Sequence, residues 1–159
     1  MTDRTGAYHH GDLRAALIAE AAAMITDGGA GSVTMREIGR RLGVSRAAPY
    51  RHFPDKAALL VAVAATGFQR LSGRLQSIDA GAQRPSVERF RRMGEEYVRF
   101  ALENPAHYRL MYGREALTRQ DVPELREAAN ALFEQVVDVI QAHQRSGGIK
   151  RQDPRAQAY

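Results

Sequence analysis

Residues 33–56 read Val-Thr-Met-Arg-Glu-Ile-Gly-Arg-Arg-Leu-Gly-Val-Ser-Arg-Ala-Ala-Pro-Tyr-Arg-His-Phe-Pro-Asp-Lys, and this stretch decides the fold that we expect. Thr34 and Glu37 have the spacing of a capping box. In such a box the hydroxyl accepts from the Glu37 amide and the carboxylate accepts from the Thr34 amide. Val33 and Ile38 occupy the two positions of a hydrophobic staple at the same helix start. A helix is therefore predicted to begin directly after Thr34.

A glycine turn and a second short helix follow in the sequence. Gly43 is predicted to end the first helix in the left-handed conformation, which costs glycine no Cβ clash. Ser45 can cap a second helix over residues 46–53, and Pro49 predicts a tight or 3₁₀ beginning because proline lacks an amide. Asp55 can cap the helix after that. Helix, tight turn and helix form the helix-turn-helix pattern, whose second helix enters the major groove of DNA.

The same stretch is strongly basic. Residues 34–56 contain six basic and two acidic side chains, a net charge of +4, and the whole chain carries only +5. Positive charge concentrated on one segment favours a polyanionic partner such as DNA. An ordinary helical hairpin with a solvated basic face is the alternative that composition alone leaves open.

These residues, with a segment before them, resemble the DNA-binding domain of TetR-type transcriptional regulators. The resemblance is carried by Thr34, Ile38, Leu42-Gly43-Val44-Ser45, Tyr50-Arg51-His52-Phe53, Lys56 and Leu59-Leu60. Tyr8-His9-His10-Gly11-Asp12-Leu13-Arg14 and the variant Ala48-Pro49-Tyr50-Arg51-His52-Phe53 are similar to the subgroup whose C-terminal half is called a WHG domain. The likeness is specific over about residues 8–60. Beyond them it rests on helix order and on Asn104-Pro105 and Tyr108-Arg109-Leu110-Met111-Tyr112-Gly113.

The expected fold is all-α. An N-terminal three-helix domain with the helix-turn-helix is predicted over residues 1–56. The resemblance implies that a long fourth helix links it to a helical domain for effector binding and dimerisation, over residues 57–159. Apolar periodicity and capping signals place the helices outside the helix-turn-helix at about 12–26, 56–78, 86–103, 105–112 and 122–146, with a further start at Asp153-Pro154. The resemblance also implies two more long helices that pair two subunits, so this sequence either is truncated or departs from the family there.

The candidate DNA contacts lie in and around the helix-turn-helix. They are Thr34, Arg36, Ser45, Arg46, Ala47, Tyr50, Arg51, His52 and Lys56. Arg46 can bind guanine in a bidentate manner, and Ala47 can meet a thymine methyl group. The resemblance implies phosphate contacts for Tyr50, His52 and Lys56. For Tyr50 and His52, simple packing beneath the turn is the alternative.

The candidate effector site lies in the second half of the chain. Its residues are Phe90, Met93, Tyr97, Phe100, His107, Tyr108, Met111, Phe133 and Val137. As a set they are richer in methionine, tyrosine and phenylalanine than a leucine-packed bundle, which is compatible with an adaptable apolar cavity. For each residue taken alone, filling of the core is the alternative.

Several other classes are disfavoured by the sequence. The chain has no cysteine, which excludes disulfides and thiol catalysis, and no apolar run approaches the roughly 18 residues of a membrane span. His9, His10 and Asp12 could be metal ligands, but no further ligand lies at a suitable spacing, and neither a metal nor a cofactor is expected. None of the histidines lies in a hydrolase motif. A DNA-processing enzyme would have only Tyr50 with Arg46 and Arg51 as its nucleophile and cations.

We therefore expect a ligand-responsive transcriptional regulator, most simply a repressor, and not an enzyme. Its expected partners are a double-stranded DNA operator, an unknown small-molecule effector and a second copy in a homodimer, with no membrane. The expected location is the cytoplasm. A helical protein-interaction module with a basic face and no specific DNA site is the main alternative, and salt-dependent binding to duplex DNA separates the two.

Overall fold

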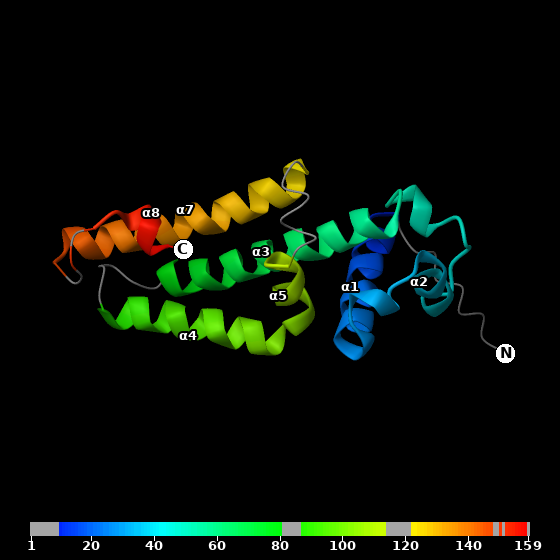
Figure 1. Cartoon of the computed structure of the whole chain (residues 1–159), viewed down its shortest axis with the longest axis horizontal. Coiled ribbons are helices and arrows are strands. Elements are labelled where there is room, and N and C mark those ends of the chain that lie inside the picture. Colours follow the sequence, from blue (N-terminus) through cyan, green and yellow to red (C-terminus); the bar gives the residue numbers. More distant parts are fainter. Residues whose placement is uncertain (1–9, 81–86, 114–121, 148–149, 151, 159) are drawn as a thin grey trace. The chain divides into compact units, whose positions relative to one another are not determined.

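The structure is a computed structural model that describes residues 10–80, 87–113, 122–147, 150 and 152–158. The described residues contain helices and no strand, which confirms the all-α class. In chain order the helices are α1 (His10–Gly28), η1 (Ala30–Ser32), α2 (Met35–Arg41), η2 (Pro49–Arg51), α3 (Lys56–Ala80), α4 (Val87–Glu103), α5 (Pro105–Met111), α7 (Pro123–Arg145) and α8 (Pro154–Gln157) (Figure 1). The chain forms two compact units, Met1–Val63 and Ala64–Tyr159, whereas the sequence placed the division after residue 56.

The core of the N-terminal unit is formed by the apolar stripes that the sequence predicts. On α1 the stripe is buried, with Leu17 and Ala21 fully so. Val33 and Ile38 are also fully buried, as expected for a hydrophobic staple. These side chains hold α2 against α1, so the helix-turn-helix is positioned by apolar packing from beneath.

The glycine turn after α2 has the predicted geometry. Gly43 has φ +67°, the left-handed region that glycine adopts without strain. Its amide donates to Arg40 O at 3.2 Å, and the Val44 amide donates to Gly39 O at 2.9 Å. This pair of bonds is the Schellman arrangement, which satisfies the last carbonyls of a helix.

The second helix of the motif is shorter than the predicted range of residues 46–53, and it has the 3₁₀ character that Pro49 predicts. Residues 46–48 form turns, and only Pro49–Arg51 are helical, as a 3₁₀ helix. The bonds run three residues back, from Ala48 N to Ser45 O at 3.0 Å and from Arg51 N to Ala48 O at 3.2 Å. Pro49 is the physical reason, because it has no amide and its ring crowds the carbonyl four residues earlier. Ser45 contributes its backbone carbonyl here, not the side-chain cap that we expected.

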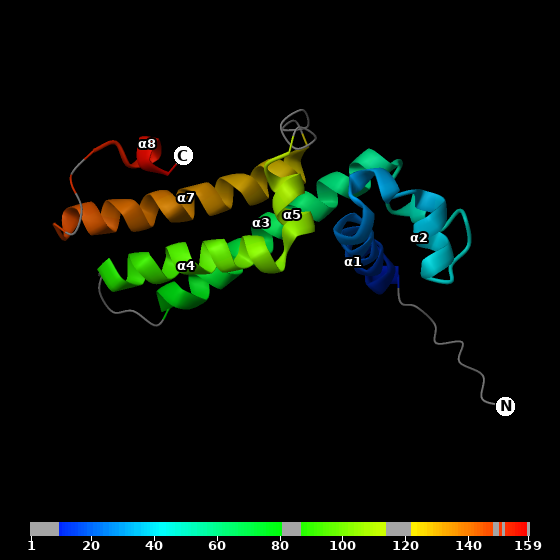
Figure 2. The same ribbon diagram turned by 60° about the horizontal axis from the view of Figure 1, so that its bottom comes forward.

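The C-terminal unit is a helical bundle. Its part of α3 lies beside α4 and α7 in both views (Figures 1 and 2). Ser72 Oγ on α3 donates to Gln135 Oε1 on α7 at 2.8 Å, and Arg74 on α3 bonds Glu103 on α4 at 2.7 Å. The ring of Phe90 on α4 lies 5.4 Å from that of His143 on α7. The three helices are therefore connected pairwise by side-chain contacts.

Several predicted helix ends are corrected in this unit. Asn104 stands before α5 without capping it, because its amide group donates back to Phe100 O at the end of α4, at 3.1 Å. Asp121 and Glu124 have the spacing of a capping box, but Asp121 lies outside the described residues, and Val122 stands before α7 without a side-chain cap. Asp153 does cap α8, where its carboxylate accepts from the Arg155 amide at 2.9 Å. On α4, the apolar residue Val87 is 64% exposed.

Candidate nucleic-acid interface

The start of α2 follows half of the predicted capping box. Thr34 Oγ1 accepts a hydrogen bond from the Glu37 amide at 3.2 Å. The Glu37 carboxylate does not return to the Thr34 amide as predicted. Instead it accepts from the guanidinium groups of Arg40 and Arg41 on the same helix. Charged donors three and four residues further along the helix form stronger bonds than a neutral amide does, which explains the difference.

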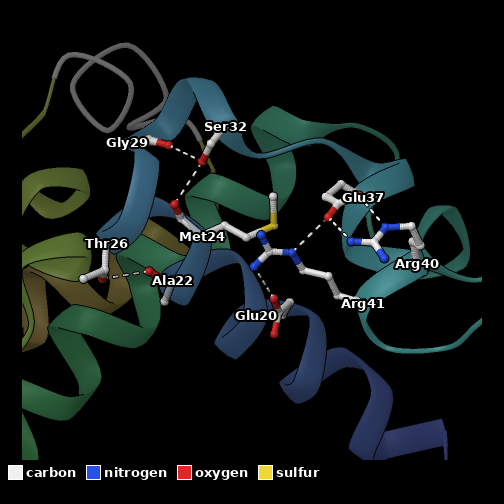
Figure 3. A network of polar contacts seen from close by, with 9 residues as sticks. All are labelled: Glu20, Ala22, Met24, Thr26, Gly29, Ser32, Glu37, Arg40 and Arg41. Atoms are coloured by element: carbon white, nitrogen blue, oxygen red, sulfur yellow. Dashed lines mark hydrogen bonds and ion pairs between the residues drawn. The ribbon is translucent and has the colours of Figure 1, made fainter.

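A network of carboxylates and guanidinium groups joins α2 to α1 (Figure 3). Arg40 is bidentate to Glu37, with Nε at 2.8 Å from Oε2 and Nη2 at 2.6 Å from Oε1. Arg41 Nε donates to Glu37 Oε1 at 3.0 Å, while its Nη1 donates to Glu20 Oε1 on α1, also at 3.0 Å. Arg41 is therefore shared between two carboxylates and ties the two helices together.

These ion pairs lower the pH at which Glu37 becomes protonated. The hydrogen bonds from Arg40 and Arg41 lower the pKa of Glu37 from its ordinary 4.5 to about 2. A lowered carboxyl pKa adds stability that is fully present above the unfolded value and is lost as the pH falls through the folded one. The network is thus charged and intact throughout the neutral range.

We expect Glu37→Gln to have a pH-dependent effect on thermal stability. The difference in melting temperature between wild type and variant should stay constant from pH 7 to about 5, then shrink toward pH 2 as Glu37 becomes protonated. Circular dichroism melts at several pH values measure it, with Glu95→Gln on α4 as a matched control outside the network. A difference that already shrinks between pH 7 and 6 would contradict this account.

Ser32 stabilises the connection between α1 and α2 through its side-chain hydroxyl. Its hydroxyl lies 2.9 Å from Met24 O and 2.7 Å from Gly29 O (Figure 3). Gly29 has φ +74°, again a conformation that favours glycine. The ammonium group of Lys56, at the start of α3, lies 3.5 Å from Gly31 O in the same connection. Asp55 caps α3 as predicted, with Oδ1 accepting from the Ala58 amide at 2.7 Å.

The predicted DNA contacts are all at least partly accessible in the N-terminal unit. Thr34, Arg36, Ser45, Arg46, Ala47, Tyr50 and Arg51 are exposed, and His52 and Lys56 are half-buried. Tyr50 is 55% exposed, so it does not pack beneath the turn. Within the described part of the chain, Arg36, Arg46 and Arg51 have no ion-pair partner, in contrast to Arg40 and Arg41.

Buried side chains support the exposed turn that contains η2. Phe53 and Pro49 are buried, and the guanidinium of Arg14 lies 5.2 Å from the centre of the Phe53 ring. Gly39 on α2 faces Pro49, whose Cγ would lie 3.4 Å from an added Cβ. The turn that carries Arg46 and Tyr50 is thus seated on α2 by close apolar contact.

Sequence reasoning missed two features of this unit. The pairing of Glu37 with Arg40 and Arg41 has a signal in the sequence, because the spacings are three and four residues on a predicted helix. The contact from Arg41 to Glu20 has none, since it depends on how α1 packs on α2. Because Arg40 and Arg41 are paired with carboxylates, residues 34–56 present less unpaired positive charge than their count of basic residues predicts.

The predicted effector residues are distributed over the C-terminal unit. Met93, Phe100, His107, Met111 and Val137 are buried, Tyr97, Tyr108 and Phe133 are half-buried, and Phe90 is 39% exposed. The rings of Tyr97 and Tyr108 lie 6.0 Å apart, and their hydroxyl oxygens 3.4 Å apart. Burial raises the pKa of Tyr97, so its phenol stays protonated. The guanidinium of Arg155 lies 5.6 Å from the centre of the Phe133 ring.

The described residues hold no group of carboxylates and histidines arranged for a metal ion. None of the described helices combines the length and the apolar character that crossing a bilayer requires. The candidate ligand His9 lies outside the described residues.

The all-α fold and the helix-turn-helix define a class of DNA-binding protein. Comparison with known proteins identifies the family. Residues 17–63 match the family of bacterial regulatory proteins called the tetR family, and residues 90–159 match a tetracyclin repressor-like C-terminal domain. The chain belongs to the TetR family.

The chain is also similar to individual curated proteins and solved structures. Nucleoid occlusion factor SlmA of Vibrio vulnificus is 32% identical over 108 residues, 68% of this chain and 54% of that protein. The chain therefore spans about half the length of the curated relatives it matches. A protein of unknown function from Rhodococcus sp. RHA1 is 34% identical with a TM-score of 0.83, over 96% of this chain and 78% of that one. The TetR family transcriptional regulator PfmR of Thermus thermophilus shares the fold at 19% identity, with a TM-score of 0.71, over 89% and 78% of the two chains.

Proposed function

We propose that this protein is a sequence-specific DNA-binding transcriptional regulator, most simply a ligand-responsive repressor that acts as a homodimer in the cytoplasm. One observation carries the proposal. Arg36, Arg46 and Arg51 are exposed without an ion-pair partner among the described residues, around a helix-turn-helix held from beneath by a buried core. Free cations at this position suit the phosphates and base edges of a major groove.

The proposed roles within this surface differ. Arg46 reads a base, because it lies at the start of the turn that enters the groove, and Ala47 meets a thymine methyl group beside it. Arg36, Arg51 and Lys56 contact phosphates. Further contacts to the sugar-phosphate backbone of the DNA come from Thr34, Ser45, Tyr50 and His52. Arg40 and Arg41 hold α2 in place through Glu37 and contribute no phosphate contact.

The two roles predict different effects of substitution. Arg46→Ala should cost about 1–3 kcal/mol on the best site and relax the preference at one base position. Lys56→Ala should weaken binding to all sequences alike and reduce the slope of log K against log salt by about one. Fluorescence anisotropy with labelled duplexes at several salt concentrations measures both. Arg40→Ala is the matched control, and its salt slope should stay near that of wild type. A change of base preference in Lys56→Ala, with none in Arg46→Ala, would reverse the two roles.

The proposed effector response uses the C-terminal unit. Helix α3 begins at Lys56, within the N-terminal unit, and continues to Ala80 in the C-terminal unit. An effector held among the aromatic and methionine residues of the second unit would act through this shared helix. It can change DNA affinity only by its differential affinity for two states, typically about 1–3 kcal/mol, and DNA must weaken effector binding by the same factor.

The name of the curated relatives favours a second candidate, a nucleoid occlusion factor. Chromatin immunoprecipitation tests the first candidate, because a repressor should occupy a few promoter-proximal sites. That the chain is not an enzyme, and that it belongs to the WHG subgroup, remain predictions.

A further inference from the structure

His107 on α5 is a buried polar residue with an unsatisfied atom. Its side chain is 5% exposed, and its Nε2 has no hydrogen-bond partner among the described residues. Leaving a buried polar atom unpaired is unfavourable, and folded proteins satisfy the large majority of such atoms. A leucine of similar size would avoid that cost, so the imidazole needs an explanation other than packing.

His107 and its neighbour Met111 both pack closely against α3. Gly67 of α3 faces it so closely that an added Cβ would lie 3.0 Å from His107 Cβ. The same added atom would lie 2.7 Å from Sδ of Met111, one turn further along α5. Methionine is unbranched and flexible, so it fills this contact with a side chain that can move aside. The contact between α3 and α5 therefore contains a side chain that can change conformation without loss of a branched core residue.

The charge state of His107 restricts what can bind it. Burial, assisted by the nearby positive charge of Arg70, lowers its pKa to about 4. The imidazole is therefore neutral at pH 7 and offers one donor and one acceptor nitrogen. An uncharged group such as a hydroxyl, which can donate or accept, suits it better than a carboxylate, which can only accept.

The tyrosines near His107, Tyr108 on α5 and Tyr112 directly after it, contact other aromatic residues. The hydroxyl of Tyr108 faces that of Tyr97 at 3.4 Å, and the rings of Tyr108 and Tyr112 lie 5.0 Å apart. Tyr112 in turn packs edge-on against Phe68 of α3, with ring centres 5.7 Å apart. Among these residues His107 is the one with a buried nitrogen that has no hydrogen-bond partner in the described part of the chain.

We propose that His107 Nε2 is the polar anchor for an uncharged effector that carries a hydroxyl group on an apolar body, and that Met111 moves aside to admit it. This inference rests on the proposed function, because it specifies the chemistry of the effector site. It assigns one residue of the predicted set to recognition, and it leaves deeply buried members such as Phe100 to the core.

The test uses the full chain, without DNA, labelled with ¹⁵N at histidine. Phenol is the hydroxyl probe, toluene is the probe of the same size without a hydroxyl, and benzoate is the anionic one. The His107 signals are identified by their absence in His107→Leu. We expect phenol to move the His107 Nε2 resonance in a saturable way and toluene and benzoate to leave it in place. His143 is the internal control, since its Nδ1 already lies 2.8 Å from Val139 O, and its signal should not respond.

The variant gives a second, independent readout. His107→Leu should be at least as stable as wild type, because it removes the unpaired atom, and it should bind phenol about three- to tenfold more weakly, as loss of one net hydrogen bond predicts. Its affinity for toluene should not fall. If the variant does not fold, the response of wild type to phenol and toluene still decides. A His107 signal that phenol does not move, or that toluene moves equally, overturns the anchor. Tighter binding of benzoate than of phenol overturns the assignment of an uncharged effector.

The same samples separate this inference from the proposed regulator. A chain that binds duplex DNA but shows no phenol response keeps the regulator and loses the anchor. A chain that responds to phenol but binds no DNA keeps the anchor and loses the regulator.

Discussion

Replacing Ile38 with alanine is expected to lower the free energy of unfolding of the N-terminal unit by about 2–5 kcal/mol, since a large buried side chain is removed and a cavity is left. Ile38 is fully buried on α2 and forms the staple with Val33. Small domains are stable by only about 5–15 kcal/mol, so this loss removes much of the unit's stability. DNA binding should weaken for every sequence alike, because the whole reading surface loses its support.

Ile38→Val is the matched control and should cost only about 0.5–1.5 kcal/mol, with DNA binding retained. Hydrogen exchange followed by mass spectrometry measures the loss region by region. Peptides from α1 and α2 should exchange faster in Ile38→Ala, while peptides from α7 keep their protection. Equal loss of protection in both units would show that the chain unfolds as one cooperative body and would contradict the division after Val63.

Gly67→Ala is expected to destabilise the C-terminal unit by about 1–3 kcal/mol, the usual cost of overpacking. The new Cβ would meet Met111 Sδ at 2.7 Å and His107 Cβ at 3.0 Å. The methionine can move away, but His107 Cβ is fixed to the backbone of α5, so the two helices must separate. That cost exceeds the gain of about 1 kcal/mol that alanine brings to a helix interior.

Gly73→Ala on the same helix provides the opposite expectation. An added Cβ there meets no atom within 4 Å, and the residue is exposed. It should stabilise the unit by up to about 1 kcal/mol through helix propensity alone. Urea unfolding followed by circular dichroism compares the two variants. If both glycines behaved alike, the close approach of α3 and α5 would not exist in solution.

Local signals in the sequence predicted much of the fold. Thr34 and Asp55 cap their helices, Gly43 ends α2, and the apolar stripe of α1 is buried. Each of these depends on residues a few positions apart, so sequence spacing is sufficient. The helix predicted over residues 46–53 is reduced to Pro49–Arg51, and its 3₁₀ form agrees with the prediction from Pro49, which lacks the amide that a continuous α-helix needs.

The parts that could not be predicted depend on how the helices pack together. The Glu37 carboxylate accepts from two arginines and not from the Thr34 amide. Arg41 reaches Glu20 only because α2 lies against α1. Val87 fits the apolar periodicity of α4 but lies at its exposed start. The effector set came from residue types alone, and composition cannot tell a core side chain such as Phe100 from one that meets a ligand.

Selection of bound duplexes from a random DNA pool tests the central claim most directly. The protein as it exists is mixed with the pool, and bound sequences are recovered over several rounds at moderate salt and sequenced. A homodimer that places two copies of η2 in the major groove predicts a palindromic consensus, with half-sites about one helical turn or a multiple apart. The Arg46→Ala protein should recover the same palindrome with one position relaxed in each half-site. Recovery of no consensus by the wild-type protein, with binding that depends on salt alone, would contradict the account.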